Sequence, residues 1–182
     1  MVKSPYANMK KVKHDFSPRV FESGIHVFCD GAAAPLPGAG GWGVVLYDDG
    51  CEVACAHGGE AFTTGNRMEL TGLFMATEAV SKLGPNVGPV TIWCDSQYCV
   101  EGVNVWMEVW KVRGWSKRKG GSPDPADGGI TDIALWQAID ATLCGIREFG
   151  QLSIRWVKGH SGVIGNERAH ELATQGMRAV SE

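Results

Sequence analysis

Three acidic residues, Asp30, Glu69 and Asp95, are the side chains of this sequence best placed to do chemistry together. Asp30 and Asp95 each end a short β-prone run. Neighbouring strands lie about 4.8 Å apart, so the two carboxylates would face one small volume if their strands are parallel neighbours. The carboxyl ends of the strands form the edge of an open α/β sheet where ligands bind. Glu69 lies in the first turn of a predicted helix, near the stripe that faces the sheet.

Three carboxylates in one place repel each other and are costly to desolvate unless a cation neutralises them. Hard oxygen ligands select Mg²⁺ or Mn²⁺. Two such ions about 3.5–4 Å apart can activate water and stabilise the leaving oxygen in an in-line phosphoryl displacement. The trio therefore predicts a divalent-metal site for phosphoryl chemistry.

Each member of the trio also has an ordinary structural interpretation. Asp30-Gly31 by itself is more often a turn, and Asp95 before Ser96 can simply cap a helix. Glu69 in a first helical turn is commonly a surface charge that compensates the helix dipole. The chemical interpretation depends on their joint placement and on the motifs described below.

Alternating strand and helix patterns surround these residues and predict an α/β fold, a mixed sheet covered by helices. The first three strands form an antiparallel meander, with Asp48-Asp49-Gly50 as a hairpin turn. The first and fourth strands are expected to be parallel neighbours. The predicted strands are 25–31, 42–47, 51–57, 90–95 and 152–157, and the predicted helices are 66–82, a short one from 96, 105–112, 131–144 and 166–179, with a loop over 114–129.

Length and composition predict one globular domain over 23–182, preceded by a flexible, mildly basic arm over 1–22. Hydrophobic residues make up 44% of the chain and charged residues 20%, which excludes a disordered chain. No apolar run is long enough for a signal peptide or a membrane span, so a cytoplasmic location is expected by default.

The distribution of charge bears on whether the chain binds nucleic acid. The net charge of −3 argues weakly against a nucleic-acid binder, but residues 111–119 carry five positive charges and no acid, which suits binding of a polyanion.

The six cysteines do not form a zinc-binding pattern. Cys51 and Cys55 are separated by three residues, but no second Cys or His pair lies at zinc-ligand spacing. They are interpreted as small buried hydrophobic residues in a reducing compartment rather than as a disulfide set.

Five motifs, in one order from about Ile25 to Ala179, resemble bacterial type 1 ribonuclease H. They are Asp30-Gly31 with Pro37-Gly38 and Gly40-Gly41-Trp42-Gly43; Thr63 to Leu70; Asp95-Ser96-Gln97-Tyr98; the basic handle with Trp106, Trp110, Lys111 and Arg113-Gly114-Trp115; and Trp156 to Gly162 followed by Asn166 to Ala173. The resemblance implies a ribonuclease H-like fold with a five-stranded mixed sheet. It also implies an endonuclease that hydrolyses the RNA strand of RNA/DNA hybrids and leaves 5′-phosphate and 3′-hydroxyl ends.

The same resemblance assigns roles to individual residues. It implies that Asp30, Glu69 and Asp95 bind two Mg²⁺ or Mn²⁺ ions, and that His160, on a mobile loop, assists proton transfer or product release. Contacts to the hybrid backbone are implied for Thr64, Asn66 and Gln97, and a grip on the DNA strand for Trp106, Trp110, Trp115, Lys111, Arg113 and Lys117. The discriminating group is the RNA 2′-hydroxyl, which DNA lacks. A monomer is expected.

The sequence departs from the family pattern at two positions. His170 stands where the family usually has a fourth aspartate, on the helix line of Ala173 and Met177, so it should still face the sheet edge. In one interpretation it replaces the aspartate as metal ligand or proton relay, and it can at the same time shift the preference toward Mn²⁺. In the other it marks a degenerate site that only binds hybrids. Leu36 stands where the family often has an asparagine, which removes one possible backbone contact.

Three function classes therefore remain open at this level. The first is a hybrid-specific endoribonuclease, and the second is a catalytically silent hybrid-binding module on the same fold. The third is a related two-metal nuclease with another substrate, because one fold hosts several activities. The handle with its tryptophans and basic residues favours the hybrid as substrate.

Overall fold

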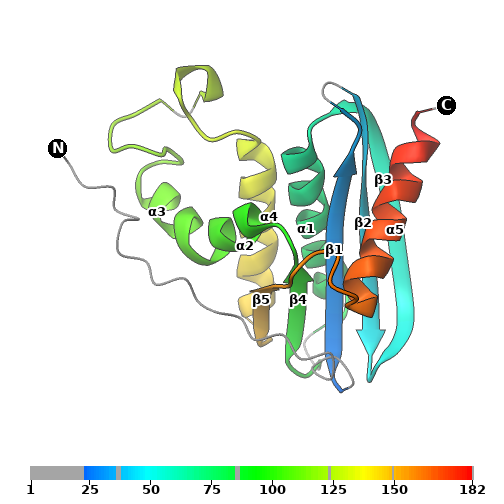
Figure 1. The fold of residues 1–182 in the computed structure, drawn as a ribbon. Coiled ribbons are helices and arrows are strands. Elements are labelled where there is room, and N and C mark those ends of the chain that lie inside the picture. Colours follow the sequence, from blue (N-terminus) through cyan, green and yellow to red (C-terminus); the bar gives the residue numbers. More distant parts are fainter. Residues whose placement is uncertain (1–22, 36–37, 85–86, 123, 149, 182) are drawn as a thin grey trace.

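A computed structural model describes residues 23–35, 38–84, 87–122, 124–148 and 150–181 (Figure 1). The strands are β1 (Ile25–Ala33), β2 (Gly38–Asp48), β3 (Cys51–Thr63), β4 (Val90–Cys94) and β5 (Leu152–Trp156). The helices are α1 (Gly65–Ser81), α2 (Gln97–Glu101), the π-helical turn η2 (Gly102–Trp106), α3 (Met107–Val112), the 3₁₀ turn η3 (Pro125–Asp127), α4 (Ile133–Arg147) and α5 (Ile164–Ala179).

The five strands form one mixed sheet in the order β3-β2-β1-β4-β5. β1 pairs antiparallel with β2, which pairs antiparallel with β3. β1 and β4 are parallel neighbours, and so are β4 and β5. The predicted fold class, meander and parallel pair are confirmed.

Helices cover both faces of the sheet, and each face has its own core. α5 packs across β1, β2 and β3 (Figure 1), and its buried Leu172 belongs to one core cluster with Phe28 and Val45 of the sheet. α1 packs on β1 from the other side and against α4. The larger core lies on this side and contains the fully buried Leu73 of α1 and Ile139 of α4. Apolar residues on both faces of β1 and β4 are what a sheet covered on both sides requires.

Glycines let α5 approach the sheet closely. A Cβ atom at Gly43 of β2 would lie 2.3 Å from the carbonyl oxygen of Ala169, which is too short for any real contact. The hairpin between β2 and β3 uses backbone freedom instead, because Asp49 and Gly50 both have positive φ, 46° and 78°. Left-handed conformations at both central positions are typical of two-residue hairpin turns.

Several elements differ from their predicted bounds. β1 continues to Ala33 because its last residues pair with β2 beyond the end of β4. β3 continues to Thr63. The two short helices predicted after residue 95 form one run from Gln97 to Val112, in which η2 joins α2 to α3. The loop predicted over 114–129 contains the turn η3.

The cysteine prediction is only partly right. All six cysteines are free, and Cys29, Cys94 and Cys99 are buried, but Cys51, Cys55 and Cys144 are exposed. Cys51 and Cys55 are exposed because they lie on the edge strand β3, which is exposed over most of its length.

Two predictions fall outside the described residues: the arm over 1–22 and the departure at Leu36. In the part of the chain that is described, no helix has both the length and the apolar character needed to cross a bilayer.

Candidate active site

Asp30 and Asp95 lie side by side because β1 and β4 run in parallel register. Cys29 and Cys94 are the last paired residues of the two strands, and each is followed by its aspartate. Asp30 is not at the end of its strand, as the sequence suggested, but within β1, and only 3% of its surface is exposed. Asp95 has left β4 and precedes α2, whose N-cap is Ser96.

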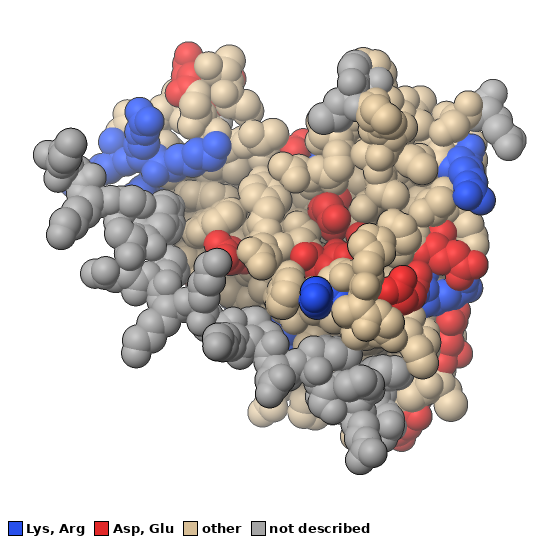
Figure 2. All heavy atoms as spheres, viewed as in Figure 1, with Lys and Arg blue, Asp and Glu red and all other residues tan. Residues whose placement is uncertain are grey.

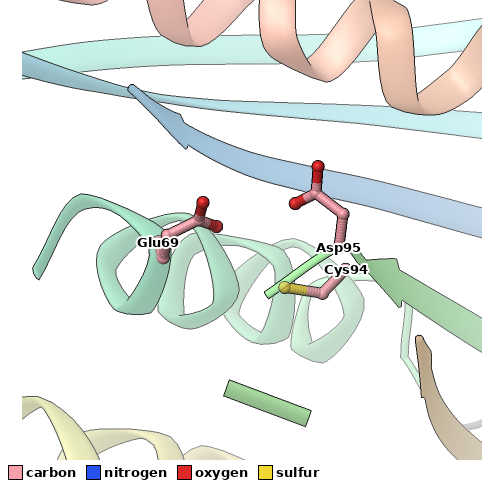
Figure 3. A group of neighbouring side chains, drawn as sticks. All are labelled: Glu69, Cys94 and Asp95. Carbon is pink, nitrogen blue, oxygen red and sulfur yellow. The ribbon is translucent and has the colours of Figure 1, made fainter. Parts of the chain in front are cut away.

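Glu69 reaches the aspartates from the second turn of α1, which begins at Gly65. Thr64 caps this helix, since its hydroxyl accepts a hydrogen bond from the backbone N–H of Arg67 at 3.2 Å. α1 begins directly against β1, where a Cβ atom at Gly31 would lie 2.2 Å from the backbone nitrogen of Glu69. Figure 3 shows the carboxylates of Glu69 and Asp95 directed toward the same space.

Burial gives the three carboxyl groups unusual proton affinities. Burial first, and then the charge of Asp95, raises the pKa of Asp30 to about 7. Burial is also the main reason that the pKa of Glu69 rises to about 10 and that the pKa of Asp95 is raised. Oε2 of Glu69 and Oδ1 of Asp95 are buried and have no hydrogen-bond partner among the described residues. A divalent cation would supply the missing partner and charge, so these residues fit a metal site.

α5, which lies on the other face of the sheet from α1, adds two polar side chains to the cluster. Nδ1 of His170 lies 2.8 Å from Oδ2 of Asp30, so His170 faces the sheet as its helix line predicts. One turn earlier, the buried Asn166 donates from Nδ2 to Oδ2 of Asp95 at 3.3 Å. Asn166 was not predicted as a site residue, although its spacing of four residues from His170 places both on one helix face.

His160 lies in the loop between β5 and α5. It is exposed and has a positive φ of 51°. Its ring contacts that of His170 edge-on, with ring centroids 4.8 Å apart. The two histidines therefore border the acidic cluster on one side, with His170 against Asp30 and His160 outside it.

Comparison with known protein families shows which family this chain belongs to. The family model described as RNase H matches residues 22–178. The chain belongs to the RNase H family. The predicted family and the ribonuclease H class of enzyme are thereby confirmed.

Individual relatives agree with this assignment. The chain is 40% identical over 153 residues to "Ribonuclease H" of Polynucleobacter asymbioticus, covering 84% of this chain and 89% of that protein. It is 39% identical over 157 residues to "Ribonuclease H" of Herminiimonas arsenicoxydans, covering 86% and 97%. The structure is similar to that of LC9-RNase H1, described as "a type 1 RNase H with the type 2 active-site motif", with a TM-score of 0.68, 27% identity and coverage of 86% of this chain and 74% of that one.

Residues predicted to contact the backbone of a hybrid flank the cluster of this RNase H chain. Thr64 and Asn66 are exposed at the start of α1, and Gln97 is exposed as the first residue of α2. Both helix starts lie next to the acidic residues, Glu69 in one case and Asp95 in the other. These three side chains are thus accessible to a ligand that reaches the carboxylates.

The predicted handle divides into a packed part and an open part. Trp110 is buried, with its ring edge-on to Trp136 of α4 at 5.3 Å, and Trp106 and Trp115 pack partly against the same core. Nζ of Lys111 lies 2.8 Å from a carboxylate oxygen of Asp140, so Lys111 is already paired within the fold.

The open part of the handle carries the accessible positive charge. Arg113 donates to the backbone oxygen of Lys117 at 2.9 Å, while Lys117, Arg118 and Lys119 are exposed. Figure 2 shows a group of Lys and Arg beside α3, and Asp and Glu gathered near the middle of the same face. The basic and acidic groups therefore share one face and are separated along it.

Proposed function

We propose that this RNase H chain hydrolyses the RNA strand of RNA/DNA hybrids at the cluster of Asp30, Glu69 and Asp95, leaving 5′-phosphate and 3′-hydroxyl ends. The observation that carries the proposal is the convergence of three largely buried carboxyl groups from β1, α1 and the end of β4. Two of their oxygens are buried without a partner in the described part of the chain. A fold does not keep such an arrangement for stability, because burying like charges costs free energy.

Asp30, Glu69 and Asp95 would hold the divalent ions, Mg²⁺ or Mn²⁺, and we infer two ions per active site. When bound, such ions lower the pKa of a coordinated water and stabilise charge on the attacking and leaving oxygens. His170 would hold Asp30 in place or share an ion with it, since its Nδ1 is 2.8 Å from that carboxylate. Asn166 would fix the orientation of Asp95 by its hydrogen bond.

His160 would move a proton at the leaving oxygen or assist departure of the product. It is exposed at the rim of the cluster, next to His170, where it can reach a substrate without displacing a packed side chain. Histidine is suited to this role because one ring nitrogen can accept a proton while the other donates one.

The substrate would lie across the face that carries both the acidic cluster and the handle (Figure 2). Thr64, Asn66 and Gln97 would contact the backbone beside the cluster. The DNA strand would lie along the handle formed by Trp106, Trp110, Trp115, Lys111, Arg113 and Lys117, in which Lys117 offers an exposed cation. Contacts to phosphate and sugar rather than to base edges imply little sequence specificity.

One observation favours a second candidate function, a hybrid-binding module with weakened catalysis. A protonated His170 would form an ion pair with Asp30 at 2.8 Å and so replace a metal ion as the neutralising charge. The handle would still bind a hybrid in that state.

We further infer that the chain acts as a monomer in the cytoplasm. The six free cysteines, three of them exposed, support a reducing compartment. Sedimentation of the purified protein with and without a hybrid tests the monomer.

A cleavage assay with a strand-labelled hybrid tests the function. The hybrid is incubated with Mg²⁺ or Mn²⁺ and either the natural chain or Asp95→Asn. Cleavage of the RNA strand alone, absent in Asp95→Asn, supports the proposal. Tight binding without cleavage in either metal would overturn it in favour of the binding module, and cleavage of duplex DNA or duplex RNA would indicate another nuclease activity.

A further inference from the structure

A thiol lies at the base of the acidic cluster. The Sγ atom of Cys94 and one carboxylate oxygen each of Glu69 and Asp95 all lie within 4.8 Å of one another. Figure 3 shows the three side chains together, with Cys94 at the end of β4 and Glu69 on α1. This arrangement arises because β4 ends at Cys94, so Asp95 no longer follows the strand's alternation and lies beside its predecessor.

Two further thiols surround Cys94 within the core. Cys29 is its partner in the parallel register of β1 and β4, Cys99 comes from α2, and all three cysteines are fully buried. Cys29 is oriented by a hydrogen bond of 3.6 Å to the carbonyl oxygen of Trp93. The Sγ atom of Cys94 makes a longer contact of 4.0 Å, with the carbonyl oxygen of Ser96. The thiols of Cys29 and Cys99 hydrogen-bond to Cys94, and Cys94 is the thiol whose sulfur lies beside the carboxylates of Glu69 and Asp95.

One sulfur and two carboxylate oxygens form a ligand set that differs from the one Mg²⁺ requires. Mg²⁺ and Mn²⁺ take oxygen ligands, whereas Zn²⁺ and Cd²⁺ favour sulfur. With zinc–sulfur and zinc–oxygen bonds of about 2.3 and 2.0–2.2 Å, ligand atoms in a tetrahedral site lie roughly 3.5 Å apart. The three atoms here lie within 4.8 Å of one another, so no pair has to approach by more than about 1.3 Å to meet that geometry. The buried, unpartnered oxygens of Glu69 and Asp95 are the ones available to bind.

We propose that Glu69, Cys94 and Asp95 form a binding site for thiophilic divalent ions such as Zn²⁺, and that an ion held there displaces the catalytic ions and stops hydrolysis. Binding releases the thiol proton to solvent, and no oxidant or reductant takes part. The site itself is independent of the nuclease activity. Only the inhibition rests on the proposed function.

Cd²⁺ titration tests the site directly, because a cadmium–thiolate bond has a charge-transfer absorption in the ultraviolet. The background variant replaces the exposed Cys51, Cys55 and Cys144 with serine, so that only buried thiols remain. In metal-free protein this variant should develop the band with one equivalent of Cd²⁺. Adding Cys94→Ala should abolish the band, whereas adding Cys29→Ala should keep it. A band that survives in Cys94→Ala, or that never forms in the background variant, overturns the site.

Zinc inhibition of hybrid cleavage at fixed Mg²⁺ tests the consequence. Each variant is compared with its own rate without zinc, and its folding is checked by thermal melting. Half-inhibition should require at least about tenfold more Zn²⁺ in Cys94→Ala and in Cys94→Ser than in the background variant, in line with the removal of one ligand. Equal inhibition of all three would overturn the second half of the proposal. If no variant cleaves hybrids with any metal, the proposed function fails while the Cd²⁺ band still decides the site.

Discussion

Nδ1 of His170 lies 2.8 Å from Oδ2 of Asp30, although 140 residues separate them in the sequence. α5 crosses the sheet at the point where β1 carries its aspartate, and this crossing brings an imidazole against the carboxylate of Asp30. When Asp30 is ionised, its carboxylate can only accept, so the imidazole donates. The cluster thus has three carboxylates and one neutral or positive partner, which lowers its attraction for a hard cation.

Replacing His170 with aspartate should therefore favour Mg²⁺. We expect His170→Asp to raise the ratio of the Mg²⁺-supported to the Mn²⁺-supported cleavage rate by about tenfold. We expect His170→Ala to lower the cleavage rate by about tenfold in both metals, because Asp30 loses its partner. Steady-state rates on a labelled hybrid measure both effects. Gln175→Ala, exposed on the same helix, is the control. An unchanged rate in His170→Ala would make His170 a bystander.

The raised pKa of Asp30 predicts that the metal-free protein loses stability as pH rises. Its carboxyl group has a pKa of about 7 in the fold, against an ordinary value of 3.8, so the folded state binds the proton more tightly than the unfolded state. Stability from this group is present at low pH and is lost as pH rises toward 7, by up to about 4 kcal/mol. Thermal melting in chelator at pH 5 and pH 8 should show the loss.

Two comparisons isolate Asp30 in that experiment. The drop in melting temperature from pH 5 to pH 8 should be smaller in Asp30→Asn, whose amide does not titrate. Mg²⁺ should stabilise the natural chain more at pH 8 than at pH 5, since protons compete with the ion. Equal pH dependence of the two proteins would contradict the role of Asp30.

The open part of the handle should govern the salt dependence of hybrid binding. Replacing Lys117, Arg118 and Lys119 together with alanine removes exposed charges that are placed to meet phosphates. We expect weaker binding and a salt slope reduced by about 0.7–0.9 for each phosphate that the protein no longer neutralises. Fluorescence anisotropy at several salt concentrations, in the Asp95→Asn background to prevent cleavage, measures the slope. The control is Lys82→Ala, an exposed lysine at the C-terminal end of α1, which should leave the salt slope unchanged.

The acidic trio was predicted from the expected joint placement of its members and from the surrounding motifs, although Asp30 lies within β1 and not at its end. The parallel pairing of β1 and β4 then placed Asp30 beside Asp95 without further information. Contacts between distant segments could not be predicted in the same way. The pairing of Lys111 with Asp140 depends on how α3 meets α4, and the bond from Asn166 to Asp95 depends on where α5 crosses the sheet.

Cys94 shows another limit of prediction from sequence. Its burial was predicted correctly, but a buried cysteine looks the same in a sequence whether it packs in a core or borders a site. Only the end of β4, which is one residue shorter than the predicted strand 90–95, places the sulfur beside the two carboxylates.

The close contact of β2 with α5 should control both stability and the site. In Gly43→Ala the new methyl group would lie 2.3 Å from the carbonyl oxygen of Ala169, so α5 must move. We expect a loss of about 1–3 kcal/mol in the free energy of unfolding. Because α5 also carries Asn166 and His170, the cleavage rate of the folded protein should fall as well. Urea denaturation and hybrid cleavage under native conditions measure the two effects.

A glycine with open space around it is the matched control for this substitution. Gly145 lies in α4, and a Cβ atom there would meet nothing within 4 Å. Gly145→Ala should stabilise the protein by about 0.5–1 kcal/mol, because alanine is the better helix former, and should leave the cleavage rate unchanged. Gly43→Ala with unaltered stability would mean that α5 can shift freely on the sheet. In that case the positions of Asn166 and His170 would not depend on β2.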